Sequence, residues 1–125
     1  MITAKRAAGL TAEIKVREHS LFSGVADGLG GHDEGLNPHE LLEGALAACT
    51  IITVQMYANR KNMKLESTDV AIKITAEGTE TRISRDIKFN GDLTLEEHAR
   101  LLEIADKCPI HRLLESHIKI DTNAL

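Results

Sequence analysis

Hydrophobic and polar residues alternate in several short stretches of the chain, and a period of two predicts β-strands. The first stretch, residues 12–18, is followed by another at 21–26, and together they predict a hairpin. A second hairpin is expected from residues 69–78 and 82–91, where apolar side chains recur at every second position. A last short strand is predicted at residues 117–122.

Between the two hairpins the pattern becomes that of one long helix. Asn37 is placed as its N-cap and Pro38 in its first turn, and only Gly44 interrupts it before about Asn62. Such a helix is about 37 Å long. It is apolar on nearly all sides, which is typical of a helix buried over most of its surface. A monomer of 125 residues has a radius of gyration of only ~14 Å, so we predict a homodimer in which a second copy covers the helix.

Two shorter helices are expected near the C-terminus. Thr94 and Glu97 form the signature of a capping box at the start of the first. A turn at Cys108 leads into the second, which begins at Pro109. The resulting order of elements predicts an α+β fold with antiparallel sheets flanking a long central helix. No linker or repeat divides the chain, so residues 1–125 are predicted to form a single domain.

Charge and composition exclude several classes of partner. A net charge of -4 and an aromatic content of 2% argue against binding to nucleic acid or to an anionic membrane surface. No apolar run approaches the ~20 residues that a membrane span needs, and the N-terminal residues lack the apolar segment of a signal peptide. With only two cysteines, the chain is predicted to be cytoplasmic, with reduced thiols.

The two cysteines differ in their predicted surroundings. Cys108 precedes a proline, so it should leave the α-helical region and could cap the next helix, where its thiolate would be favoured. His111 and Arg112 follow it closely. The alternative is a plain corner between two helices. Cys49 lies in the middle of the long helix, where it is either a small buried side chain or a thiol that needs a nearby cation to react.

A metal site is a weaker alternative for the same residues. Cys108 and His111 have the C-x-x-H spacing of some zinc sites, to which His39 or His32 could contribute. No second pair of ligands has a matching spacing, and no glycine-rich phosphate-binding loop is present. We therefore predict no metal and no cofactor.

Two charged residues stand out by their position. Arg85 interrupts the apolar face of its strand, so it is either buried beside a carboxylate or thiolate, or extends to solvent from a sheet edge. Glu40 lies in the first turn of the long helix, where it complements the helix dipole. Glu40 could instead hold a catalytic arginine or position a substrate.

Three segments together resemble one known family. They are "GLGGHDEGLNPHELLEGALAACT", "MYANRKNMKLE" and "IADKCPIHRLLE", and their combination is similar to the OsmC-like family, which includes the organic hydroperoxide resistance proteins. The resemblance implies an intertwined α+β homodimer with long central helices packed together. It also implies thiol-dependent reduction of organic hydroperoxides and hydrogen peroxide, with an external dithiol as reductant.

The resemblance also assigns roles to individual residues. Cys49 would attack the peroxide and Cys108 would resolve the resulting sulfenic acid as a disulfide, although local position alone gives the lower pKa to Cys108. In well-studied members a glutamate follows the helix-start proline and pairs with an arginine, whereas here His39 takes that place and Glu40 comes next. The supporting arginine would be Arg17 or Arg85. The alternative is a non-catalytic protein of this fold that binds a small apolar or thiol metabolite in the dimer-interface cleft.

Overall fold

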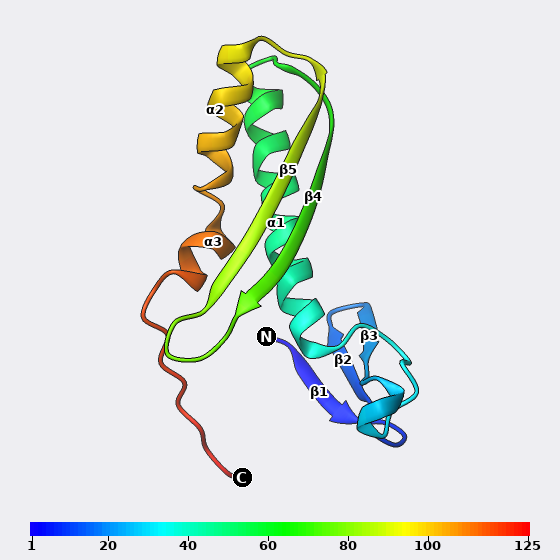
Figure 1. Ribbon diagram of the computed structural model, residues 1–125. Helices are drawn as coiled ribbons and strands as arrows, with labels where there is room; N and C mark the ends of the chain where they lie inside the picture. Colours follow the sequence, from blue (N-terminus) through cyan, green and yellow to red (C-terminus); the bar gives the residue numbers. More distant parts are fainter. The chain divides into compact units, whose positions relative to one another are not determined.

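The computed structural model describes all 125 residues, which form two compact units, residues 1–42 and 43–125. The first unit is built around a small antiparallel sheet (Figure 1). Its strands are β1 (Thr3–Arg6), β2 (Ala12–Val16) and β3 (His19–Ser23), in that order across the sheet. The predicted first hairpin is confirmed in β2 and β3. The hydrophobic pattern missed β1, because all four of its residues are exposed and none alternates with a buried one.

After β3, a glycine-rich segment folds back against the same sheet. It contains a short 3-10 helix, η1 (Asp27–Leu29). The Ser23 hydroxyl donates to the Leu36 carbonyl over 2.8 Å, which ties the end of the segment to β3. At Gly35 a Cβ atom would lie 2.2 Å from the Phe22 carbonyl oxygen, so only glycine allows this close approach.

The long helix, α1 (Pro38–Arg60), begins at the predicted place. The Asn37 side chain accepts a hydrogen bond from the Glu40 backbone over 2.9 Å, and the Glu40 carboxylate accepts one from the Asn37 backbone over 2.9 Å. These reciprocal bonds satisfy two N–H groups that have no partner within the helix. They confirm Asn37 as the N-cap residue.

The second unit, residues 43–125, combines most of α1 with a long hairpin and two helices (Figure 1). The hairpin consists of β4 (Lys64–Ala76) and β5 (Arg82–Asp92), which pair antiparallel as predicted. It is followed by α2 (Leu95–Ala105), which starts with the predicted capping box at Thr94 and Glu97, and by α3 (Pro109–Leu114).

The core of this unit lies where α1, α2 and the hairpin meet. Its fully or almost fully buried members come from α1, β4 and α2, and they are Val54, Ala58, Leu65, Leu101, Ile104 and Ala105. Ile87 and Phe89 pack against this cluster from β5. The apolar face of β5 therefore points at the helices, and Arg85, two positions before Ile87 on the same face, points the same way.

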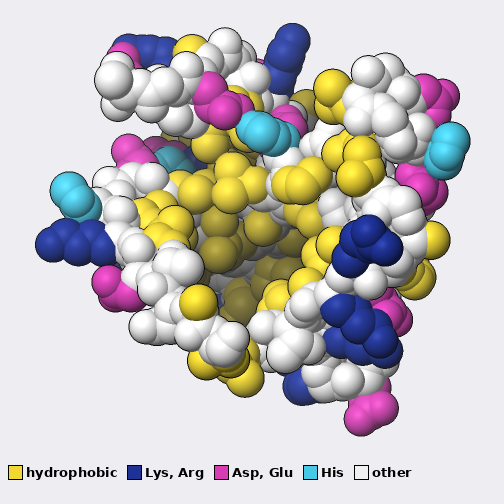
Figure 2. All heavy atoms as spheres, turned by 90° about the horizontal axis from the view of Figure 1, so that it is seen from below, with side chains coloured by type: hydrophobic (Ala, Val, Ile, Leu, Met, Phe, Trp, Pro, Cys, Tyr) yellow, Lys and Arg dark blue, Asp and Glu magenta, His cyan; other side chains and the backbone are white.

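Only one stripe of α1 is buried within the chain. The buried side chains follow each other at intervals of four residues: Leu46, Thr50, Val54 and Ala58. Ile52 and Met56 are 58% and 66% exposed on another face, and Figure 2 shows many hydrophobic side chains open at the surface. The sequence predicts a helix buried on most sides, and one copy of the chain does not supply that cover.

Two sequence predictions about apolar segments are corrected by the structure. Residues 117–122 form no strand, because no neighbouring strand pairs with them and an unpaired strand has unsatisfied backbone groups. Helix α1 is long and apolar enough to cross a membrane by length and composition, contrary to the expectation of no such run. Its buried stripe packs against α2 and the hairpin, so it is a core helix of its unit.

Candidate active site

The two thiols of the chain meet in the second unit. Cys49 lies on α1 and Cys108 at the N-cap of α3, and a side-chain hydrogen bond links them. Both are free thiols, with Cys108 fully buried and Cys49 partly exposed. The fold therefore brings together the two sulfur atoms that the sequence singles out, from elements separated by the entire β4–β5 hairpin and α2.

Local backbone chemistry places Cys108. Helix α2 ends at Ala105, and Cys108 adopts an extended conformation (φ -57°, ψ 133°), as expected for a residue before proline. Its sulfur accepts a hydrogen bond from the backbone N–H of His111 over 3.4 Å. The prediction that Cys108 ends one helix and caps the next is confirmed.

The two thiols have opposite pKa shifts. Burial tends to raise the pKa of the Cys49 thiol, but hydrogen bonds from the Cys108 thiol, the Ile110 backbone and the Thr53 hydroxyl together outweigh it and lower that pKa. Burial, followed by the hydrogen bond to Cys49, raises the pKa of Cys108. A negative charge costs less free energy at a sulfur that water reaches, so the thiolate belongs on Cys49. The order of the two pKa values is the reverse of that expected from the N-cap position alone, because Cys108 is fully buried and its thiol donates a hydrogen bond to Cys49.

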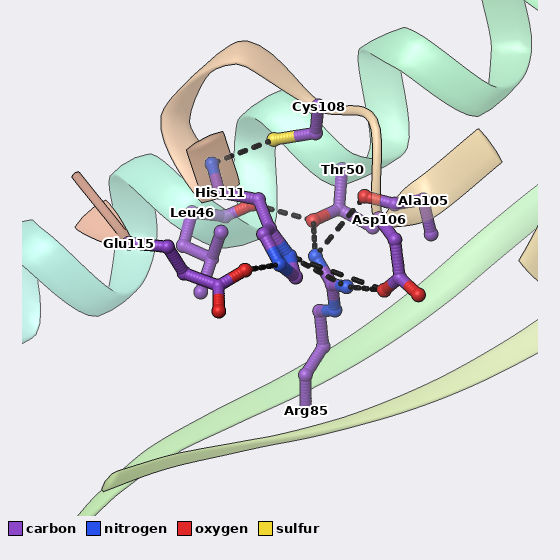
Figure 3. A network of polar contacts seen from close by, with 8 residues as sticks. All are labelled: Leu46, Thr50, Arg85, Ala105, Asp106, Cys108, His111 and Glu115. Atoms are coloured by element: carbon purple, nitrogen blue, oxygen red, sulfur yellow. Dashed lines mark hydrogen bonds and ion pairs between the residues drawn. The ribbon is translucent and has the colours of Figure 1, made fainter. Parts of the chain in front are cut away.

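Arg85 joins the elements that carry the two thiols (Figure 3). Its guanidinium donates to the Thr50 hydroxyl on α1 over 3.1 Å and to the Ala105 carbonyl at the end of α2 over 3.3 Å. It also contacts Asp106 Oδ1 at 2.8 Å and His111 Nδ1 at 3.0 Å. The side chain is only 11% exposed. Of the two interpretations of Arg85, the buried and paired one is confirmed, and its partner is a carboxylate.

The arginine acts on the site through its neighbours. Neither sulfur is among its hydrogen-bond partners, and Thr50 is the residue that follows Cys49 on α1. Thr50 is itself fully buried, and its hydroxyl donates to the Leu46 carbonyl over 2.7 Å, which leaves its lone pairs for Arg85. Arg85 thus fixes the corner between α2 and α3 against α1, and with it the position of Cys108.

The other predicted site residues lie in the first unit. Glu40 is engaged in the capping box of α1. Arg17 lies in the tight turn between β2 and β3, with a left-handed φ of 52°. The structure does not test a catalytic role for either residue, so these roles remain predictions.

The predicted zinc ligands do not converge. The His111 ring contacts Arg85 and Glu115, and no three His, Cys, Asp or Glu side chains are grouped so that they could hold a metal ion. The C-x-x-H spacing of Cys108 and His111 reflects the helix cap, in which His111 supplies its backbone N–H.

Sequence reasoning missed several polar residues around the thiols. They are Thr50, Thr53, Asp106 and Glu115. Two of them had a weak signal: Thr53 lies one helical turn after Cys49, and Glu115 one turn after His111. Asp106 could be found only from the spatial neighbourhood of Arg85.

Comparison with known proteins identifies the relatives of this fold. The family model described as OsmC-like protein matches residues 31–123. No curated protein sequence matches the chain.

Solved structures match over almost the whole chain. An OsmC-like protein from Mycoplasma pneumoniae is 18% identical with a TM-score of 0.75, covering 92% of this chain and 86% of that one. An organic hydroperoxide resistance protein from Legionella pneumophila is 21% identical with a TM-score of 0.68, covering 92% and 88%. Another such protein, from Elizabethkingia anophelis, is 21% identical with a TM-score of 0.67, covering 94% and 89%. At these identities the solved structures establish a shared fold.

Proposed function

The chain belongs to the OsmC-like family, and from this we propose that it is a thiol-dependent peroxidase that reduces organic hydroperoxides, and hydrogen peroxide, through Cys49 and Cys108. One observation carries the proposal: the fold brings the only two cysteines of the chain into hydrogen-bond contact, with the lower pKa on the more exposed sulfur. Two cysteines at unrelated positions in the chain would not be expected to lie in hydrogen-bond contact. Two of the matching structures are organic hydroperoxide resistance proteins, which supports the same chemistry.

The first step is nucleophilic attack by the Cys49 thiolate on one oxygen of the peroxide. An S–O bond forms and the O–O bond breaks, so the sulfur is oxidised to a sulfenic acid and the peroxide is reduced to an alcohol. The leaving alkoxide must take up a proton. The Cys108 thiol, which is hydrogen-bonded to Cys49, is our candidate for this proton donor.

The second step forms a disulfide. Burial is the main cause of the raised pKa of Cys108, and the negative charge of Cys49 adds to it; this second contribution disappears once Cys49 is a sulfenic acid. The Cys108 thiolate then attacks the Cys49 sulfur, the S–S bond forms as the S–O bond breaks, and the departing hydroxide takes a proton from solvent and leaves as water. An external dithiol completes the cycle by thiol–disulfide exchange and is itself oxidised.

The remaining residues have supporting roles in this proposal. Arg85 holds the Cys108 corner in place, and Arg17 and Glu40 are candidates for contact with the peroxide. The two compact units would together form one OsmC-like domain, since the solved relatives cover 92% or more of the chain. The working form would be a homodimer, because the exposed apolar face of α1 with Ile52 and Met56 needs cover that one chain does not supply. We place this homodimer in the cytoplasm.

Stopped-flow mixing of the reduced protein with cumene hydroperoxide, combined with thiol counting, tests the proposal. We expect rapid loss of both thiols, no rapid loss in Cys49→Ser, and sulfenic acid without a disulfide in Cys108→Ser. If neither thiol of the wild-type protein is consumed faster than a free thiol, the peroxidase function is wrong.

A second function is a non-catalytic binding protein. The first unit has an open hollow of about 270 Å³ lined mainly by apolar surface, including Leu10, Val25 and Pro38. Its apolar lining would favour a small apolar ligand over a charged one. In this case a Cys49→Ser variant would bind the same ligand as the wild-type protein, and neither would consume peroxide.

A further inference from the structure

The imidazole ring of His111 is held from three elements at once (Figure 3). Arg85 on β5 lies 3.0 Å from Nδ1, and Asp106 at the end of α2 lies 3.9 Å from the same nitrogen. Glu115 at the end of α3 contacts Nε2 through its carboxylate. The ring is 23% exposed, so both of its nitrogens are occupied by protein groups in a largely enclosed position.

The identity of these partners fixes the protons of the ring. A guanidinium group can only donate hydrogen bonds, so Nδ1 next to Arg85 must be the acceptor. The ring proton is therefore on Nε2, where it is donated to the Glu115 carboxylate. His111 is neutral in this arrangement, and neither nitrogen is free to take a proton from a thiol.

The backbone of the same residue reaches the thiol pair. Its N–H donates to the Cys108 sulfur over 3.4 Å, and the backbone of the preceding residue, Ile110, hydrogen-bonds the Cys49 sulfur. These two groups belong to the first turn of α3, which has only six residues and little stability of its own. The ring of His111, which contacts Arg85 on β5, is one anchor that ties this turn to the rest of the unit.

We propose that His111 is a positioning residue of the thiol pair: its ring, clamped between Arg85 and Glu115, holds the first turn of α3 so that the backbone N–H groups of Ile110 and His111 point at the two sulfurs. The activation of Cys49 by Arg85 is then indirect. The arginine orders the histidine, and the backbone beside the histidine stabilises the thiolate. The consequence for peroxide turnover rests on the proposed function, but the consequence for thiol reactivity does not.

The obvious rival role for His111 is that of a proton acceptor for the thiols. Two substitutions separate the roles. In His111→Asn the side-chain amide oxygen can still accept the hydrogen bond of Arg85 but cannot act as a base at neutral pH. In His111→Leu the acceptor is lost, and Arg85 faces an apolar group. His98→Leu serves as the matched control, because it removes a histidine of α2 that packs on Phe89 of β5, away from the thiols.

The readout is the rate at which iodoacetamide alkylates Cys49 across a pH series, with the modified residue identified by mass spectrometry. Alkylation needs no peroxide, so a protein that fails to reduce peroxide can still support or overturn the inference. We expect His111→Leu to react about threefold to fivefold more slowly at neutral pH, with the difference vanishing at high pH where both proteins are thiolates. His111→Asn should stay within about twofold of the wild-type rate, and His98→Leu should be unchanged.

Two results overturn the inference. If His111→Leu keeps the wild-type pH profile, the ring does not position the N–H groups. If His111→Asn loses as much reactivity as His111→Leu, the ring acts as a base or in another way that the Arg85 contact does not explain. Should His111→Leu fail to fold by circular dichroism, Arg85→Lys gives the same test, because a lysine keeps the charge and loses the forked geometry that reaches Asp106 and His111 together. Arg85→Lys with an unchanged profile would again contradict the inference.

Discussion

The thiol of Cys108 donates a hydrogen bond to the sulfur of Cys49, and this contact lowers the pKa of Cys49 while it raises that of Cys108. In the proposed mechanism this relationship orders the two residues: Cys49, the sulfur that water reaches, is the nucleophile, and the buried Cys108 holds its proton until Cys49 has reacted.

Removal of the Cys108 thiol should make Cys49 less reactive. In Cys108→Ala the hydrogen bond to the Cys49 thiolate is lost, so we expect its alkylation at neutral pH to slow by about threefold or more. In Cys108→Ser the hydroxyl can still donate, and most of the reactivity should remain. Competitive labelling of the three proteins with iodoacetamide measures this. Equal rates in the Ala and Ser variants would contradict a role for the donor.

The reaction with peroxide should follow the lowered pKa of Cys49. The reactive species is the thiolate, so the rate rises as the pH increases through that pKa and levels off above it. Because the pKa is lowered, the plateau begins at a lower pH than for a free cysteine peptide. Single-turnover rates with cumene hydroperoxide over a pH series provide the curve. A midpoint at or above that of the free peptide would show that the environment of Cys49 does not favour its thiolate.

Loss of Arg85 should destabilise the protein. Arg85→Ala leaves the buried Thr50 hydroxyl and the Ala105 carbonyl without this donor and removes the ion pair with Asp106. Asp106 is largely exposed, which limits the cost, and we expect a loss of about 2 kcal/mol in the free energy of unfolding. The control is Arg82→Ala on the same strand, whose exposed pair with Glu80 should be worth less than about 0.5 kcal/mol. Urea denaturation gives both values, and similar losses in the two variants would contradict the buried network.

The exposed face of α1 should mediate dimer formation. Ile52→Glu and Met56→Glu place charges on that face, and each should shift the protein towards monomer in sedimentation experiments. Lys73→Glu, at an exposed position of β4, should leave the state of association unchanged. A wild-type protein that sediments as a monomer at all concentrations would refute the dimer.

Much of the fold could be predicted from the sequence, because periodicity reports which side chains are buried. The capping residues Asn37 and Thr94 marked the starts of α1 and α2, and the pre-proline position of Cys108 marked the corner before α3. Strand β1 was missed because its residues are exposed, and the alternation of residues 117–122 gave a strand that has no partner within one chain. Alternation shows that a segment could pair, whereas formation of the strand also requires a neighbour.

The site was harder to predict than the fold, because its contacts join residues of separate elements. The sequence singled out both cysteines and Arg85, because Cys108 precedes a proline and Arg85 interrupts an apolar strand face, but it left open whether Arg85 is buried or extends to solvent. It could not show that Cys108 would be the more deeply buried thiol or that Arg85 would bind Asp106 and His111, because those contacts depend on how β5, α1 and the α2–α3 corner pack. The pKa order of the two thiols follows from that packing.

The most direct test of the proposed peroxidase is the fate of the two sulfurs after one equivalent of cumene hydroperoxide. Non-reducing peptide mapping by mass spectrometry should show one disulfide that links Cys49 to Cys108 of the same chain, and dithiothreitol should restore both thiols. If both cysteines remain as free thiols while the peroxide persists, the dithiol mechanism is wrong.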